Sequence, residues 1–212
     1  MNLFEEEKNW PEAFKPLIEK YKGKQHPLHY GNIYQLLVMV VLSAQDNDAH
    51  INKIAPGFFA KYPNMEALAK ANTAELTEAL SSVRFHTNKI SWLQDIASEL
   101  KTDDNIPTTM KALTALKGVG RKSANVIMRE AGVEAEGILV DLHVLRVVPR
   151  LGISDGKNAD QVEKGLMNKL PRNMWAEAGM AISFLGRETC RPTNPKHSEC
   201  VIRHYCDYCN RQ

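Results

Sequence analysis

The chain has 212 residues, 43% hydrophobic and 25% charged, with a formal net charge of +2. This length can bury a core and fold without a partner, as one domain or two small ones. The longest apolar run, around residues 33–42, falls short of the roughly 18 residues that span a bilayer, which excludes a membrane protein. The first ten residues, MNLFEEEKNW, are acidic where a secretory leader is basic, so we expect a cytoplasmic protein.

The charge is unevenly divided between the two halves of the chain. Residues 1–106 carry 11 Lys and Arg against 14 Asp and Glu, whereas residues 107–212 carry 16 against 11. A basic second half is compatible with a polyanionic partner. An uneven solvated surface would give the same counts, so charge alone does not decide between these interpretations.

Helical periodicity dominates the chain, which predicts an all-α fold. Pro11 suits a first helical turn, Asn72 and Thr73 are candidate caps, and Pro107 with Thr108 opens another helix. The expected helices lie near residues 11–21, 31–44, 48–60, 65–70, 74–82, 86–101, 108–115, 121–131, 141–151, 159–169 and 173–185.

A helix-hairpin-helix pattern stands in the second half of the chain, in the sequence LTALKGVGRKSANVIMRE. Gly118 and Gly120 allow turn angles closed to other residues and expose backbone N–H groups beside a helix N-terminus, which favours phosphate binding. Val119 would fill the space between the helices. Lys117 and Arg121 would add positive charge toward a DNA backbone. A tight turn between two packed helices is the alternative.

All four cysteines lie near the C-terminus, at positions 190, 200, 206 and 209. A disulfide framework would usually tie distant parts of a short secreted chain together. Such a cluster of cysteines in an intracellular protein indicates a metal site instead.

Together, four segments resemble the endonuclease III family of helix-hairpin-helix DNA glycosylases. They are the hairpin, the segment VDLHVLRV at 140–147, the segment LLVMVVLSAQDND at 36–48 and the cysteine-rich end. Their order and spacing agree over roughly residues 12–206, although Leu142 stands where the family usually has threonine. The resemblance implies a base-excision-repair glycosylase with abasic-site lyase activity. Its partner would be double-stranded DNA with damaged bases, expected to be oxidised pyrimidines, or abasic sites.

The resemblance assigns the catalytic roles to Lys122 and Asp141. A neutral lysine amine can attack the deoxyribose C1′ as the base leaves, which gives a Schiff base from which β-elimination breaks the 3′ phosphate bond. The helix N-terminus, Arg121 and a buried pocket would each disfavour the charged amine. Asp141 would stabilise the positive charge that develops on the sugar. As alternatives, Lys122 is a solvated helix lysine and Asp141 a helix cap.

The resemblance also implies two residues that fill the gap left by an extruded base. Gln45 matches the glutamine of the family's LLSAQ motif. The family's G-L-Y-N-S-K appears here as RFHTNK, so Phe85 replaces a leucine wedge and His86 a tyrosine in the pocket wall. These departures predict an altered base preference, whereas a packed loop without DNA contact is the alternative.

For the metal site, the family's C-x6-C-x2-C-x5-C spacing places a four-iron, four-sulfur cluster at Cys190, His197, Cys200 and Cys206. One cysteine has therefore become histidine, but Cys209 follows directly. Thiolates are the usual ligands of such clusters, so we expect the ligands to be the four cysteines: Cys190, Cys200, Cys206 and Cys209. Zinc held by four cysteines, or by three and a histidine, is also chemically sound.

The expected architecture is two helical lobes. Residues 26–134 form a six-helix domain with the hairpin, and residues 1–25 with 135–212 form a discontinuous helical domain that ends in the iron–sulfur cluster loop. A monomer would bind chromosomal DNA across the cleft, with Lys122 and Asp141 facing each other. The alternatives are a mismatch or uracil-type glycosylase of the same superfamily, which often lacks the lysine, and a non-catalytic DNA-binding iron–sulfur protein.

Overall fold

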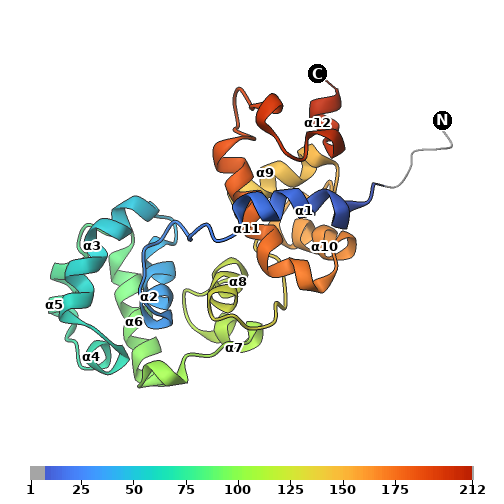
Figure 1. The fold of residues 1–212 in the computed structure, drawn as a ribbon. Coiled ribbons are helices and arrows are strands. Elements are labelled where there is room, and N and C mark those ends of the chain that lie inside the picture. Colours follow the sequence, from blue (N-terminus) through green and yellow to red (C-terminus); the bar gives the residue numbers. More distant parts are fainter. Residues whose placement is uncertain (1–7, 212) are drawn as a thin grey trace. The chain divides into compact units, whose positions relative to one another are not determined.

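The computed structural model describes residues 8–211, and these residues form helices and no β-strand (Figure 1). The all-α prediction is confirmed. The α-helices of the described part are α1 Trp10–Tyr21, α2 Ile33–Ser43, α3 Asp48–Lys61, α4 Met65–Ala69, α5 Thr73–Leu80, α6 His86–Leu100, α7 Met110–Ala115, α8 Arg121–Glu130, α9 Leu142–Leu151, α10 Ala159–Lys169, α11 Trp175–Glu188 and α12 Asp207–Asn210.

Asparagine starts many of these helices, because its side-chain oxygen accepts one of the free N–H groups of the first turn. Asn72 accepts the N–H of Glu75 at 2.8 Å, as the sequence predicts. The helix expected from residue 108 begins at Met110 instead, since Thr109 is its cap. The other asparagine caps of this kind are Asn9, Asn32, Asn47, Asn64 and Asn158.

The chain divides into two compact units, and residues 25–133 form one of them. Its centre is α2, whose residues 36–42 are all buried. Helices α3, α6 and α8 pack against α2, while α4 and α5 pack against α6 and α7 packs against α8 (Figure 1). A helix that is apolar on every side is stable in water only when neighbours surround it, so the packing around α2 forms the core of this unit.

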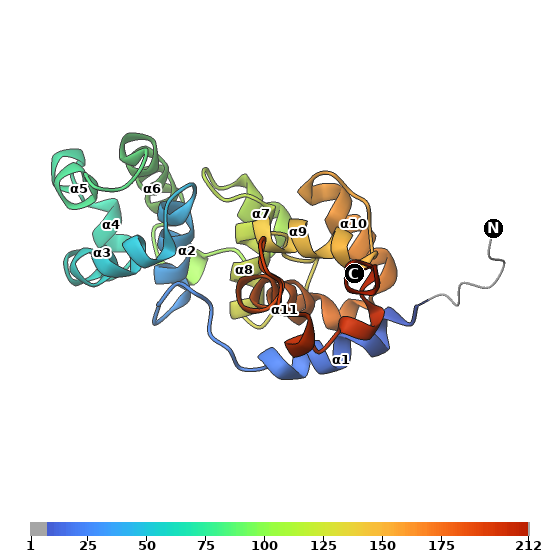
Figure 2. The ribbon, with the colours of Figure 1, turned by 90° about the horizontal axis from the view of Figure 1, so that it is seen from above.

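The other unit joins residues 8–24 to residues 134–211. Helix α11 packs against α9 and α1, and α10 and α12 pack against α9 (Figure 2). Helix α11 runs three residues beyond the expected end at 185, and Gly186 lies in this extension. A Cβ at Gly186 would lie only 2.8 Å from the Cβ of His143, so a side chain there would collide with α9.

No helix within residues 8–211 is long and apolar enough to cross a membrane.

Candidate functional site

The predicted hairpin forms between α7 and α8. Val119 is 4% exposed and donates its N–H to the carbonyl of Leu116 at 3.1 Å, so it fills the turn as expected. Within residues 8–211, the backbone N–H groups of Gly118 and Gly120 donate no hydrogen bond. They stand beside the N-terminus of α8, where backbone donors and the helix dipole favour an anion.

The two glycines of this turn serve different purposes. Gly118 has a φ of +80°, and a Cβ there would lie 2.6 Å from Cε3 of Trp92. Gly120 is the N-cap of α8 with a φ of −89°, and a Cβ there would meet nothing within 4 Å. Gly118 therefore lets the turn fit over Trp92, whereas Gly120 leaves open space in front of the helix.

Lys122 is the second residue of α8 and is exposed. The N-terminus of α8 and the adjacent Arg121 lie beside it in the sequence. Lys117 is also exposed and forms an ion pair with Asp95 at 2.7 Å.

Asp141 caps α9, because its Oδ1 accepts the N–H groups of His143 at 2.8 Å and Val144 at 2.9 Å. Its Oδ2 accepts the hydroxyl of Ser183 at 2.6 Å and lies 3.7 Å from a guanidinium nitrogen of Arg187. Ser183 and Arg187, both on α11, were not expected from the sequence. The carboxylate is therefore held in one orientation and is 9% exposed.

Gln45 and Phe85 share a backbone conformation that non-glycine residues rarely adopt. Their φ angles are 57° and 58°, in the left-handed region, which costs about 1–2 kcal/mol for such residues. Within residues 8–211, only Lys101 and Asn194 are further non-glycine residues with positive φ. Gln45 is exposed, Phe85 is 51% exposed, and the following residue, His86, is half-buried. Strain of this kind concentrates at functional sites.

The four cysteines line one pocket. Cys190 follows the end of α11, Cys200 and Cys206 lie on the loop after it, and Cys209 is on α12. Burial raises the pKa of the Cys200 and Cys206 thiols. Positive charge from a bound metal group would offset this cost by stabilising the thiolates.

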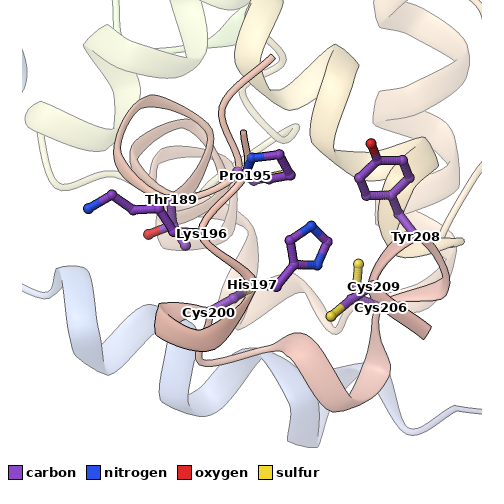
Figure 3. A pocket seen from close by; sticks show the side chains of 9 residues that line it. Thr189, Pro195, Lys196, His197, Cys200, Cys206, Tyr208 and Cys209 are labelled. Carbon is purple, nitrogen blue, oxygen red and sulfur yellow. The ribbon is translucent and has the colours of Figure 1, made fainter. Parts of the chain in front are cut away.

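His197 lies in the same pocket (Figure 3). Its ring stacks on Tyr208, with centroids 5.8 Å apart. Its Nε2 is buried and has no hydrogen-bond partner among residues 8–211. In that part of the chain, no three His, Cys, Asp or Glu side chains are arranged around a single metal ion. Four thiols lining one pocket are the ligands that an iron–sulfur cluster requires.

Comparison with known proteins agrees with this geometry. The model of the HhH-GPD superfamily of base excision DNA repair proteins matches residues 38–172, more than half of the chain. The model of the iron-sulfur binding domain of endonuclease III matches residues 190–206. The fold and the hairpin thus define a base-excision DNA repair protein.

Individual relatives identify the family to which the chain belongs within this class of DNA repair proteins. Endonuclease III of Synechocystis sp. is 35% identical over 192 residues, covering 90% of this chain and 88% of that protein. Endonuclease III of Bacillus subtilis is 36% identical over 183 residues, covering 84% and 83%. The chain belongs to the endonuclease III family, and its activity is that of a DNA glycosylase and abasic-site lyase.

Solved structures agree with this assignment. The structure of a trapped endonuclease III–DNA covalent intermediate, an estranged-adenine complex, matches with a TM-score of 0.82 at 31% identity, covering 94% of this chain and 95% of that one. A thermostable thymine-DNA glycosylase matches with a TM-score of 0.80 at 20% identity, which shows a shared fold alone. The protein binds DNA and carries a four-iron, four-sulfur cluster in its C-terminal segment.

Proposed function

We propose that this enzyme removes oxidised pyrimidines from double-stranded DNA and cleaves abasic sites through Lys122. The position of Lys122 carries the proposal: it follows directly after a hairpin whose free N–H groups suit a phosphate. Its Nζ attacks C1′ as the glycosidic bond breaks, and the base leaves with the bonding electrons. The nitrogen loses a proton and the C1′–O4′ bond breaks, with a proton going to O4′, which gives the imine. The imine, protonated on nitrogen, then loses a proton from C2′ as the C3′–O bond breaks and the 3′ phosphate leaves.

Asp141 supplies the negative charge for this reaction. Positive charge develops on the sugar as the base leaves, and a fixed carboxylate stabilises it without reorganising. The bonds from Ser183 and from the first turn of α9 support this role, because they hold the carboxylate in place. DNA that covers the exposed Lys122 would desolvate its amine, so the amine would become more nucleophilic on the substrate.

Gln45 and Phe85 fill the gap left by the extruded nucleotide. Their exposure and shared left-handed backbone support this role. The flat ring of Phe85 stacks on a neighbouring base better than a leucine would, and His86 would line the base pocket. These two departures from the family motif are the reason to expect a changed base preference.

The hairpin holds the DNA backbone without reading its sequence. Gly118 and Gly120 would present backbone N–H groups to a phosphate, with Val119 filling the turn between them, and Lys117 and Arg121 would add charge. We expect the protein to act as a monomer on chromosomal DNA in the cytoplasm, because one chain supplies every residue named for the reaction.

We expect the cluster to be held by Cys190, Cys200, Cys206 and Cys209, and His197 to lie outside the ligand set. All five side chains line the pocket, so the choice rests on chemistry. Iron–sulfur clusters favour anionic sulfur ligands over neutral nitrogen. The competing set exchanges Cys209 for His197, which keeps the family's spacing and ends at Cys206, as does the matched iron–sulfur segment.

A borohydride trapping assay on duplex DNA with an abasic site tests the role of Lys122. The wild-type protein should become covalently linked to the DNA, because borohydride reduces the Schiff base. Lys122→Gln should abolish the adduct while the melting temperature and the affinity for abasic duplex change little, since Lys122 is exposed and packs in no core.

The neighbouring Arg121 offers a matched control. Arg121→Gln removes a positive charge at the same helix end and should weaken binding yet retain trapping at saturating protein. A wild-type protein that never traps would refute the lyase role of Lys122. Base release from thymine glycol, dihydrouracil, uracil and 8-oxoguanine duplexes then identifies the preferred lesion.

A further inference from the structure

Asp46 joins the two loops that carry Gln45 and Phe85. Its carboxylate Oδ2 accepts the backbone N–H of Arg84 at 2.8 Å. Its Oδ1 accepts the backbone N–H of Asn47 at 2.7 Å. Asp46 follows Gln45 and Arg84 precedes Phe85, so a single carboxylate bridges the neighbours of both proposed gap-filling residues.

His50 makes a second link between the same segments. Its Nδ1 lies 2.9 Å from Oδ1 of Asp46, and its Nε2 lies 3.2 Å from the hydroxyl of Ser82. The segment after α2 and the segment before α6 are thus connected at Arg84 and at Ser82. Phe85 and Gln45 are both exposed, so these links do not serve to bury either side chain.

The charge on Asp46 strengthens the bridge. Burial acts to raise its pKa, but hydrogen bonds from His50, Arg84 and Asn47 outweigh burial and lower the pKa to about 2. The carboxylate is therefore ionised at neutral pH, and hydrogen bonds to charged acceptors are shorter and stronger than neutral ones. Such a bridge can hold two neighbouring residues in a backbone conformation that they would otherwise leave.

We infer that Asp46 and His50 are positioning residues that set the spacing of Gln45 and Phe85 before DNA binds. The inference rests on the proposed function, in which these two side chains fill the gap left by the extruded nucleotide. Two side chains that are already in place lose little conformational entropy when DNA binds. More of the binding free energy then remains for extruding the base.

A purely structural bridge and a positioning bridge differ in how Asp46 is coupled to Phe85. A positioning residue acts through Phe85, so its removal matters little once Phe85 is an alanine. A structural residue destabilises the fold whether or not the phenyl ring is present. The effects of the Asp46 and Phe85 substitutions on the trapping rate are then additive. A double-mutant cycle therefore separates the two roles.

The experiment uses the purified protein with its cluster and compares two DNA substrates. Single-turnover borohydride trapping is measured on abasic duplex and on a single-stranded abasic oligonucleotide, which needs no gap filling. Asp46→Ala should slow trapping on duplex about 10-fold and change the single-stranded rate less than about 2-fold. Adding Asp46→Ala to Phe85→Ala should slow duplex trapping only about 2-fold further. Glu78→Ala, which removes an exposed carboxylate from α5, should match the wild type on both.

Asp46→Asn provides a second variant of nearly the same shape, in case the alanine variant folds poorly. Its amide keeps one acceptor oxygen in place of two, so the backbone N–H of either Arg84 or Asn47 loses its acceptor. Duplex trapping should again be slowed selectively. The inference would be overturned if the trapping rate fell equally on both substrates, or if the losses in rate were additive in the double mutant. Trapping on duplex at the wild-type rate in both Asp46 variants would overturn it as well. A wild-type protein that traps neither substrate overturns the proposed function and this inference with it.

Discussion

At the scale of single residues, Asp141 combines a structural and a chemical role in one side chain. One oxygen caps α9, and the other accepts the hydroxyl of Ser183 and faces Arg187. A carboxylate with all these donors keeps its orientation as charge develops nearby, which is the condition for electrostatic stabilisation of a transition state. Ser183 itself is 1% exposed and reaches no substrate, so it acts through Asp141.

We predict that Ser183→Ala slows base release about 10-fold, because a buried hydrogen bond to a charged group is lost. Affinity for abasic duplex should stay near the wild-type value, because Ser183 is buried. Single-turnover base release and DNA titration are the measurements. Thr77→Val, which removes a hydroxyl from α5, is the control. An unchanged rate would mean that Arg187 and the helix cap suffice.

At the scale of elements, the hairpin depends on two glycines for two different reasons. Gly118 combines a positive φ with close contact to Trp92, whereas Gly120 has an ordinary φ and open space around it. The first glycine is thus required for the fold of the turn. The second keeps the N-terminus of α8 accessible to a phosphate oxygen.

Alanine at each glycine should separate stability from DNA binding. Gly118→Ala should lower the free energy of unfolding by about 1–2 kcal/mol from backbone strain alone, with a further loss from the collision with Trp92. Gly120→Ala should keep nearly the wild-type melting temperature but bind undamaged and abasic duplex more weakly. Thermal unfolding and DNA titration are the measurements. Wild-type stability of Gly118→Ala would contradict the assigned turn geometry.

At the scale of the whole molecule, the cysteine segment belongs to the unit that contains both ends of the described chain. The Lys8 ammonium donates to the carbonyl of Tyr205 at 2.9 Å, and the ring of Trp10 lies 6.3 Å from that of Tyr205. Helix α1 also packs against α11, which leads into Cys190. Binding of the cluster should therefore stabilise the whole of this unit.

The ligand set can be tested by comparing two single substitutions. Cys209→Ala should lose iron and sulfide and lower the melting temperature, because one thiolate ligand is removed. His197→Ala should retain the cluster and its colour. Metal and sulfide analysis after anaerobic purification, with visible absorbance, is the measurement. A cluster that survives Cys209→Ala and is lost in His197→Ala would show that the family's spacing is kept, and zinc without iron would refute the cluster itself.

The sequence alone predicted most of the secondary structure, the all-α fold and the iron–sulfur segment at the C-terminus. Helix starts such as Asn72 and the fold of the glycine turn depend on hydrogen bonds and backbone angles within a few residues, so they can be read locally. The errors at residue 108 and at the end of α11 are boundary errors. The Thr109 cap sets the start of α7, and α11 continues through Gly186, which packs against α9.

Only the tertiary structure decided which side chains support the site residues. Ser183 is 42 positions from Asp141, and Arg84 is 38 from Asp46, so no local pattern connects them. The exposure of Lys122 likewise depends on what the rest of the fold leaves uncovered. Local sequence determines helices because their hydrogen bonds join near neighbours. Contacts between distant residues follow from how those helices pack, which a single sequence does not state.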